Sequence, residues 1–189
     1  MKVLILYGSP HRKGATAPFA DELRKCGAEV SEEWIYEKHL EPCRGCGVCQ
    51  DRIGEVGCVH DDDFAPLVDE IAASDLVVFA TPIYAWFLPG PVKTFMDRLI
   101  YAPIKKYGRE TAPSLLSGRA TTAIIVTSGY PPKETVVPFE MSLGKLSECL
   151  GMNYLGWSGG TDPGKGKVFM NEKKEQRMRS FAHELLSKL

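Results

Sequence analysis

Apolar residues along the chain occur in short runs and in amphipathic stretches that alternate from one end to the other. A short apolar run without polar alternation is typical of a parallel strand that is buried on both faces. Such runs predict buried strands at Val3–Tyr7, Leu76–Ala80 and Thr121–Thr127, and a short last strand at Tyr154–Trp157. In Val30–Tyr36 apolar residues alternate with polar ones, which predicts a partly exposed edge strand.

Amphipathic stretches between these runs predict helices. The first is Ala17–Cys26, with Thr16 as its N-cap and Gly27 directly after its end. Asp61–Asp63 place negative charge and a cap ahead of a second helix. This second helix is predicted at Phe64–Ala73. Later helices are predicted at Val92–Ile100 and Val137–Leu150. A closing helix is capped by Asn171 and has Met178, Phe181, Leu185 and Leu186 on one face.

Strands that alternate with helices, without an internal repeat or linker, predict a single α/β domain over residues 1–189. We expect a doubly wound, five-stranded parallel sheet with right-handed crossovers. If Val30–Tyr36 is an edge strand, the first strand lies inside it and the natural strand order is 2-1-3-4-5. A ligand is then expected at the switch point between strands one and three. No element is assigned to residues 102–116.

The first predicted strand leads into a loop of small and basic residues, Gly8–Thr16. Backbone N–H groups and a helix N-terminus, together with the hydroxyls of Ser9 and Thr16, are suited to a phosphomonoester. The loop also contains positive or potentially positive side chains, namely His11, Arg12 and Lys13. An ordinary turn between strand and helix is the alternative. The loop lacks both the dinucleotide fingerprint and the P-loop motif, which argues against a Rossmann dehydrogenase and an ATPase.

Two further loops are expected at the same switch point. Thr81–Pro91 offers Tyr84 and Trp86 as flat apolar surfaces, and Thr127–Tyr130 offers successive backbone N–H groups near Gly129. A phosphate site, aromatic surfaces and hydrogen-bond donors together describe a site for flavin mononucleotide (FMN), although either aromatic ring alone would suit subunit or helix packing. The candidate cofactor-binding residues are Ser9, His11, Arg12, Gly14, Ala15, Thr16, Pro82, Ile83, Tyr84, Ala85, Trp86, Thr127, Ser128, Gly129 and Tyr130.

Composition narrows the functional classes. The chain has 189 residues, 44% of them hydrophobic and 25% charged, which is enough for one domain with a sizeable core. Its formal net charge of -1 gives no electrostatic case for binding nucleic acid. No apolar run has the length of a signal peptide or a membrane span, so we expect a cytoplasmic protein without a membrane partner. Its six cysteines should then be mostly reduced.

These segments together resemble the flavodoxin-like NAD(P)H-dependent FMN reductase family, which also includes the iron-sulfur flavoproteins. The resemblance extends over nearly the whole chain. It rests on Gly8-Ser9-Pro10 with Gly14 and Thr16, on Pro42–Cys49 with Gly57-Cys58 and Asp61-Asp62, on Pro82-Ile83-Tyr84, and on Lys93–Arg98. His11 and Ala15 stand where the family often has arginine and asparagine.

The resemblance implies an FMN-dependent enzyme that takes two electrons from NAD(P)H and passes them to a small-molecule acceptor. The implied acceptors are quinones, nitro or azo aromatics, and free flavin, and no catalytic side chain is expected because the cofactor carries the chemistry. A homodimer or a higher homo-oligomer is also implied, with Trp86 and Phe87 as candidate interface residues. A flavodoxin-type electron carrier is the rival hypothesis. The net charge near zero and the basic loop argue against it, because such carriers dock through acidic surfaces.

Four cysteines crowd into one segment. Cys43, Cys46 and Cys49 follow a C-x2-C-x2-C pattern, and Cys58 comes eight residues after the third. Thiolates at that spacing can reach three corners of an iron-sulfur cluster. Zinc is less natural, since no second C-x2-C pair lies at a distance. In the family that this chain resembles, members without a cluster keep a similar cysteine loop. We therefore expect no metal here, with an iron-sulfur cluster as the alternative.

Overall fold

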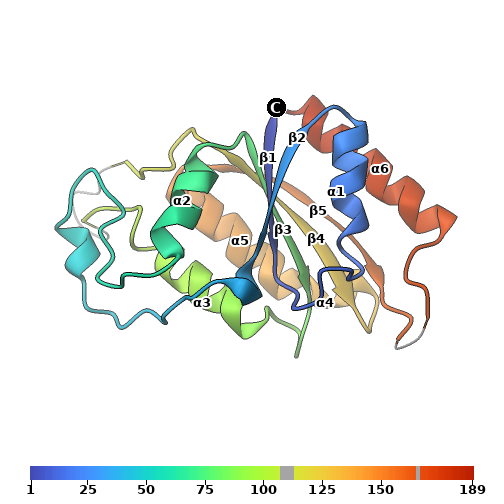
Figure 1. Ribbon diagram of the computed structural model, residues 1–189, viewed down its shortest axis with the longest axis horizontal. Helices are drawn as coiled ribbons and strands as arrows, with labels where there is room; N and C mark the ends of the chain where they lie inside the picture. Colours follow the sequence, from blue (N-terminus) through green and yellow to red (C-terminus); the bar gives the residue numbers. More distant parts are fainter. Residues whose placement is uncertain (107–112, 165–166) are drawn as a thin grey trace.

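The computed structural model describes residues 1–106, 113–164 and 167–189, and in it five strands form one parallel sheet (Figure 1). The strand order is β2-β1-β3-β4-β5, and each neighbouring pair is parallel. The predicted fold class and strand order are therefore confirmed. The strands are β1 (Lys2–Tyr7), β2 (Glu29–Trp34), β3 (Leu76–Pro82), β4 (Thr121–Ser128) and β5 (Asn153–Thr161).

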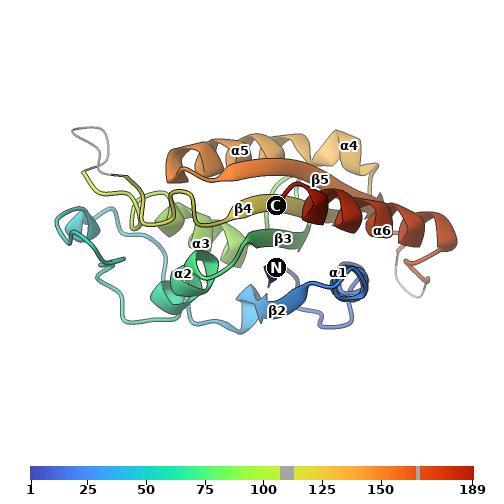
Figure 2. The same ribbon diagram turned by 90° about the horizontal axis from the view of Figure 1, so that it is seen from above.

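Helices cover both faces of the sheet, which Figure 2 shows edge-on. On one face lie α1 (Pro18–Lys25) and α6 (Glu172–Ser187). On the other lie α2 (Phe64–Ala72), α3 (Gly90–Leu99) and α5 (Val137–Leu150). Shorter elements complete the described chain: the 3-10 helices η1 (Ile35–Glu37) and η2 (Val48–Gln50), and the four-residue helix α4 (Pro132–Thr135). None of the helices in the described parts is both long and apolar enough to cross a membrane.

Alternation along β1 shows why the sheet is covered on both sides. Side chains of successive strand residues point to opposite faces. Val3, Ile5 and Tyr7 pack with α1 and α6, whereas Leu4 and Leu6 pack with the helices of the other face. All five are at most 1% exposed. β2 is paired only with β1 and has no fully buried residue, as expected for an edge strand.

Several predicted boundaries are wrong in instructive ways. α1 begins at Pro18 after Ala17, and the side chain of Thr16 does not cap it. Proline suits the first turn of a helix because its missing N–H would have no partner there. β2 ends at Trp34, because Ile35–Glu37 turns into a 3-10 helix.

Other boundaries extend the sequence prediction or agree with it. β5 continues to Thr161, since Gly159 and Gly160 stay in register with β4. Asn171 caps α6 as predicted, and its Oδ1 accepts a hydrogen bond from the Lys174 N–H at 3.0 Å. Within the unassigned segment 102–116, residues 107–112 lie outside the described chain, and Lys105 is buried.

Close packing at the end of β1 gives a test of the fold. A Cβ on Gly8 would lie 2.4 Å from Thr81 Oγ1 and 2.6 Å from Val92 Cγ2. We therefore expect Gly8→Ala to lower the free energy of unfolding by about 1–3 kcal/mol, the usual cost of overpacking. Urea unfolding at neutral pH measures the change. Gly144→Ala is the matched control, because its Cβ would meet only Tyr154 Cδ1 at 3.9 Å, and an unchanged Gly8 variant would contradict the packing described here.

Candidate functional site

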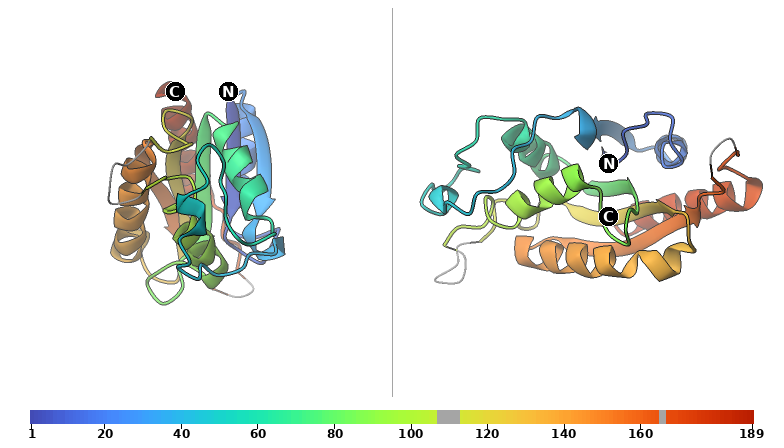
Figure 3. Two further views of the ribbon diagram at one scale, coloured as in Figure 1. Left: turned by 90° about the vertical axis from the view of Figure 1, so that its left-hand side faces the viewer. Right: turned by 90° about the horizontal axis from the view of Figure 1, so that it is seen from below.

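Three loops meet at the carboxyl edge of the sheet, which faces the viewer in the right panel of Figure 3. Tyr7 is paired with Ala80, and Pro82 is paired with Thr127, so β1, β3 and β4 end side by side. The Gly8 N–H donates to the Ala80 carbonyl at 2.9 Å. This is the predicted switch point, where open α/β sheets bind their ligands.

The loop after β1 leaves several donors without a partner. Ser9 is buried, and its Oγ accepts a hydrogen bond from the His11 N–H at 3.2 Å. Thr16 is 2% exposed, and its hydroxyl makes no hydrogen bond to any described residue. Within the same part of the chain, no bond engages the backbone N–H groups of Arg12, Lys13, Ala15 or Thr16. Unpaired N–H groups just ahead of a helix form a concave surface that suits an anion.

The basic side chains of this loop differ in their contacts: Arg12 is paired, whereas His11 and Lys13 face a cavity. Nε and Nη2 of Arg12 donate to the Glu37 carboxylate at 2.8 and 2.5 Å, and the guanidinium lies 4.4 Å from the centre of the Trp34 ring. His11 and Lys13 are exposed. With Gly14 and Ala15 they line an open cavity of about 510 Å³, and residues of the β5–α6 loop line its other side. A phosphate contact from Arg12 stays a prediction.

The loop after β3 makes a tight turn that presents two aromatic rings. Tyr84 and Phe87 exchange N–H···O bonds of 2.9 Å, and between them Ala85 and Trp86 have φ values of 49° and 59°. Non-glycine residues in this left-handed region carry strain, and such residues cluster at functional sites. Tyr84 is 49% exposed and Trp86 is 59% exposed, whereas Ile83 is buried.

An aromatic pair joins the second loop to the third. The Trp86 and Tyr130 rings stack with their centroids 5.9 Å apart and an interplanar angle of 22°. The Ser128 hydroxyl donates to the Tyr130 carbonyl at 2.7 Å and fixes the start of this loop. Among the described residues, the N–H groups of Gly129 and Tyr130 have no partner. The structure thus brings the predicted residues of all three loops to one edge, while their contacts with a cofactor remain predictions.

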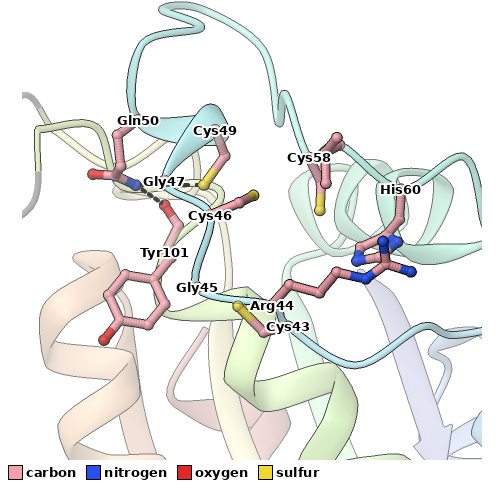
Figure 4. A pocket seen from close by; sticks show the side chains of 11 residues that line it. Cys43, Arg44, Gly45, Cys46, Gly47, Cys49, Gln50, Cys58, His60 and Tyr101 are labelled. Atoms are coloured by element: carbon pink, nitrogen blue, oxygen red, sulfur yellow. Dashed lines mark hydrogen bonds between the residues drawn. The ribbon is translucent and has the colours of Figure 1, made fainter.

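The four clustered cysteines lie elsewhere, in the segment between η1 and α2. We call the cavity that they line the cysteine pocket; it has a volume of about 320 Å³ (Figure 4). All six cysteines of the chain are free thiols. Within the described residues, no group of three or more Cys, His, Asp or Glu side chains is arranged to hold a metal ion. The observed arrangement therefore does not fit a cluster, and the expectation of a metal-free loop stays a prediction.

Buried cations anchor this segment. The Arg98 guanidinium, from α3, donates to both carboxylate oxygens of Asp62 at 2.5 and 2.9 Å and to the Glu41 carbonyl at 3.1 Å. Burial would raise the pKa of Asp62, but hydrogen bonds from Arg98 and from the backbone N–H groups of Glu41 and Phe64 outweigh it and lower the pKa to about 2. The side chains of the pair are each 1% exposed.

A second buried cation completes the anchoring. Lys105 Nζ donates to the carbonyls of Cys49, Val56 and Ala102 at 2.9, 3.2 and 2.7 Å, which uses all three of its hydrogens. Burial lowers the pKa of Lys105. Our sequence reasoning missed the anchoring role of Arg98 and Lys105 and the pairing of Glu37 with Arg12, although Lys93–Arg98 and Asp61-Asp62 were matched as motifs. The sequence signal that could have found these residues is the recurrence of charged side chains within and beside those motifs.

Comparison with known proteins assigns the family. A sequence model of the family described as NADPH-dependent FMN reductase matches residues 1–131, and the chain belongs to that family. An iron-sulfur flavoprotein of Archaeoglobus fulgidus is 30% identical over 89% of this chain and 72% of its own length. An FMN-dependent NADH:quinone oxidoreductase of Methylorubrum populi is 33% identical over 39% of this chain and 37% of its own length.

The fold has a close counterpart among solved structures. An NAD(P)H:quinone oxidoreductase from Methanothermobacter marburgensis superposes with a TM-score of 0.71, covers 98% of each chain and is 16% identical. At that identity the likeness concerns the fold alone. The family comprises NAD(P)H-dependent FMN oxidoreductases, so FMN and NAD(P)H are the expected cofactor and co-substrate. The resemblance inferred from the motifs is confirmed.

Replacing Asp62 tests the anchoring of the cysteine segment. We expect Asp62→Asn to lower the free energy of unfolding by about 3–5 kcal/mol at pH 7, because it leaves a buried guanidinium uncompensated. Since the folded-state pKa of Asp62 is lowered, its contribution is present above the ordinary carboxyl pKa and is lost as pH falls toward about 2. The difference in free energy of unfolding between Asp62→Asn and the unchanged protein should therefore shrink in that acidic range. Urea unfolding at pH 7 and in that acidic range measures the loss of stability, with the exposed neighbour in Asp61→Asn as control. Equal stability of the two variants at pH 7 would contradict the assignment.

Proposed function

We propose that this protein is an FMN-dependent oxidoreductase that takes two electrons from NAD(P)H and passes them to a small-molecule acceptor. The observation that carries the proposal is the set of unpaired donors between β1 and α1, at the edge where an exposed aromatic pair also lies. Membership of the FMN reductase family supports the same cofactor.

The loop between β1 and α1 fits a single terminal phosphate. Its donors are backbone N–H groups and the hydroxyl of Thr16, a residue that is 2% exposed and whose hydroxyl has no partner among the described residues. A phosphate oxygen can accept hydrogen bonds from these unpaired donors, and such charge-assisted bonds are stronger than neutral ones. Ser9 has a second task, because its Oγ already orders the loop through the His11 N–H. We assign FMN rather than FAD to this site, since one loop suits one terminal phosphate.

The second and third loops suit the ring system. Trp86 and Tyr130 supply flat apolar surface, and the N–H groups of Gly129 and Tyr130 supply donors. Bound FMN supplies the hydride chemistry between NAD(P)H and the acceptor. The role of the protein is to hold the ring and to offer preorganised donors toward negative charge that develops on it, which requires no catalytic acid or base.

The acceptor and the oligomeric state belong to this proposal. Quinones, nitro or azo aromatics and free flavin are planar molecules that can stack where a nicotinamide has left. The Methylorubrum populi relative, an FMN-dependent NADH:quinone oxidoreductase, favours a quinone among them. We also propose a homodimer with Trp86 at its interface, since this large apolar side chain is 59% exposed. Phe87, by contrast, is half-buried against the core and contributes less surface. Sedimentation of the FMN-loaded protein would reveal a monomer if the dimer proposal is wrong.

The rival hypotheses predict different behaviour. An electron carrier of flavodoxin type would bind FMN without turning over NAD(P)H. An iron-sulfur flavoprotein is favoured by the Archaeoglobus fulgidus relative, but the observed geometry of the cysteine pocket does not fit a cluster. We therefore derive no electron-transfer step through a cluster.

Thr16 offers a sharp test of the phosphate site. Thr16→Val keeps the shape of the side chain but removes a charge-assisted hydrogen bond worth about 1.5–3 kcal/mol, so FMN should bind roughly 10- to 150-fold more weakly. Replacing Ser9 and Thr16 together by alanine should weaken binding further. Quenching of flavin fluorescence on titration measures the affinity. Thr121→Val, at the opposite end of β4, is the control, and an unchanged affinity in both loop variants would remove this loop from the site.

Reduction by a nicotinamide tests the enzyme hypothesis. Anaerobic stopped-flow mixing of the FMN-loaded protein with NADH or NADPH should bleach the flavin absorbance, and a quinone added afterwards should restore it. The Thr16→Val variant, once saturated with FMN, should bleach at a similar rate, because Thr16 is assigned to the phosphate and not to the ring. If neither nucleotide bleaches the flavin, the electron-carrier hypothesis replaces the proposal.

A further inference from the structure

The cysteine pocket has no role in the proposed FMN chemistry, yet it concentrates nucleophilic side chains. Cys43, Cys46, Cys49 and Cys58 all line it. The first two are exposed and the other two are half-buried, so small molecules in the cavity can reach sulfur. Figure 4 shows the side chains projecting from two separate stretches of the segment into the space between them.

Cys58 differs from the other pocket thiols in its hydrogen bonding. Nη2 of Arg98 donates one hydrogen to Asp62 Oδ1 at 2.9 Å and one to Cys58 Sγ at 3.2 Å. Cys49 Sγ receives a hydrogen bond from the neutral side-chain amide of Gln50, at 3.6 Å. Of the hydrogen bonds between described residues, only the one from Arg98 to Cys58 Sγ joins a pocket thiol to a charged donor. Cys58 therefore combines partial exposure with a hydrogen bond from a guanidinium, and both features are found at reactive cysteines.

The walls of the cysteine pocket favour an anionic ligand. Arg44 and His60 contribute to the lining, and no Asp or Glu does so among the described residues. His60 Nε2 is buried and has no hydrogen-bond partner in the described part of the chain. A buried polar atom without a partner requires an explanation, and a ligand carboxylate supplies one. The Arg44 guanidinium can pair with the same group, because it binds carboxylates with two N–H donors.

We propose that Cys58 is a nucleophilic thiol that undergoes exchange with small disulfides carrying carboxylate groups. The Cys58 sulfur attacks one sulfur of the disulfide, a new S–S bond forms, and the old S–S bond breaks. The departing sulfur takes the bonding electron pair and the proton that Cys58 loses. Cys58 is thereby oxidised to a mixed disulfide, and half of the small molecule leaves as a reduced thiol. The proposal does not depend on FMN.

Two aliphatic disulfides of opposite charge test this proposal on the full-length protein. The probes are dithiodipropionate, a dianion, and cystamine, a dication, and mass spectrometry of peptides follows each mixed disulfide over time. Cys149 is exposed on α5, outside the pocket, and serves as the internal reference for the intrinsic reactivity of each probe. Relative to Cys149, Cys58 should favour the dianion by about tenfold, because the Arg44 guanidinium lines the pocket and pairs with carboxylates. Equal preference at the two cysteines would overturn the proposal.

Variants of the lining residues Arg44 and His60, which we call rim variants, test whether the pocket or the charge of the whole protein selects the probe. Arg44→Gln and His60→Gln should each reduce the preference of Cys58 for the dianion severalfold, whereas Arg119→Gln, at an exposed position outside the pocket lining, should not change it. An unchanged preference in both rim variants would contradict the proposed recognition. Iron and acid-labile sulfide are assayed on the same protein after anaerobic preparation. Stoichiometric iron would also overturn the proposal, since the thiols would then be occupied.

Discussion

The buried pair of Arg98 and Asp62 is the interaction on which much of the irregular structure depends. Residues 38–63 contain no strand and only one short 3-10 helix, and such long connections need anchoring to hold one shape. Arg98 fixes both ends of this segment, because it binds the Glu41 carbonyl near its start and Asp62 near its end. Lys105 holds the middle through the carbonyls of Cys49 and Val56. Separating a buried charge from its partner is strongly unfavourable, so these bonds fix the shape of the segment that lines the cavity.

Helix α3 connects this anchored segment with the carboxyl edge of the sheet. It begins at Gly90, shortly after the strained turn that presents Tyr84 and Trp86, and it carries Arg98 in its last turn. The same rigid helix therefore supports the proposed flavin loop at one end and the cysteine pocket at the other. Functional residues commonly lie on loops that a rigid scaffold positions, and here two candidate sites share one support.

The sheet and its order were predictable because they follow from periodicity. Buried parallel strands give continuous apolar runs, and the polar alternation in Val30–Tyr36 was enough to place an edge strand beside β1. Long-range polar pairs leave no such signal. Arg98 occupies a position in an amphipathic helix where a charged residue predicts exposure, yet it is 2% exposed. The left-handed turn at Ala85 and Trp86 was also hidden, since neither residue is glycine or asparagine.

Arg12 shows how a structural contact and a predicted ligand contact can coexist. Its ion pair with Glu37 is exposed at both side chains, and exposed pairs contribute only about 0–1 kcal/mol. A charge-assisted hydrogen bond to a phosphate is worth about 1.5–3 kcal/mol. The predicted phosphate contact would therefore outweigh the ion pair. Glu37 and the Trp34 ring therefore leave Arg12 among the predicted cofactor-binding residues, with its guanidinium held beside the loop.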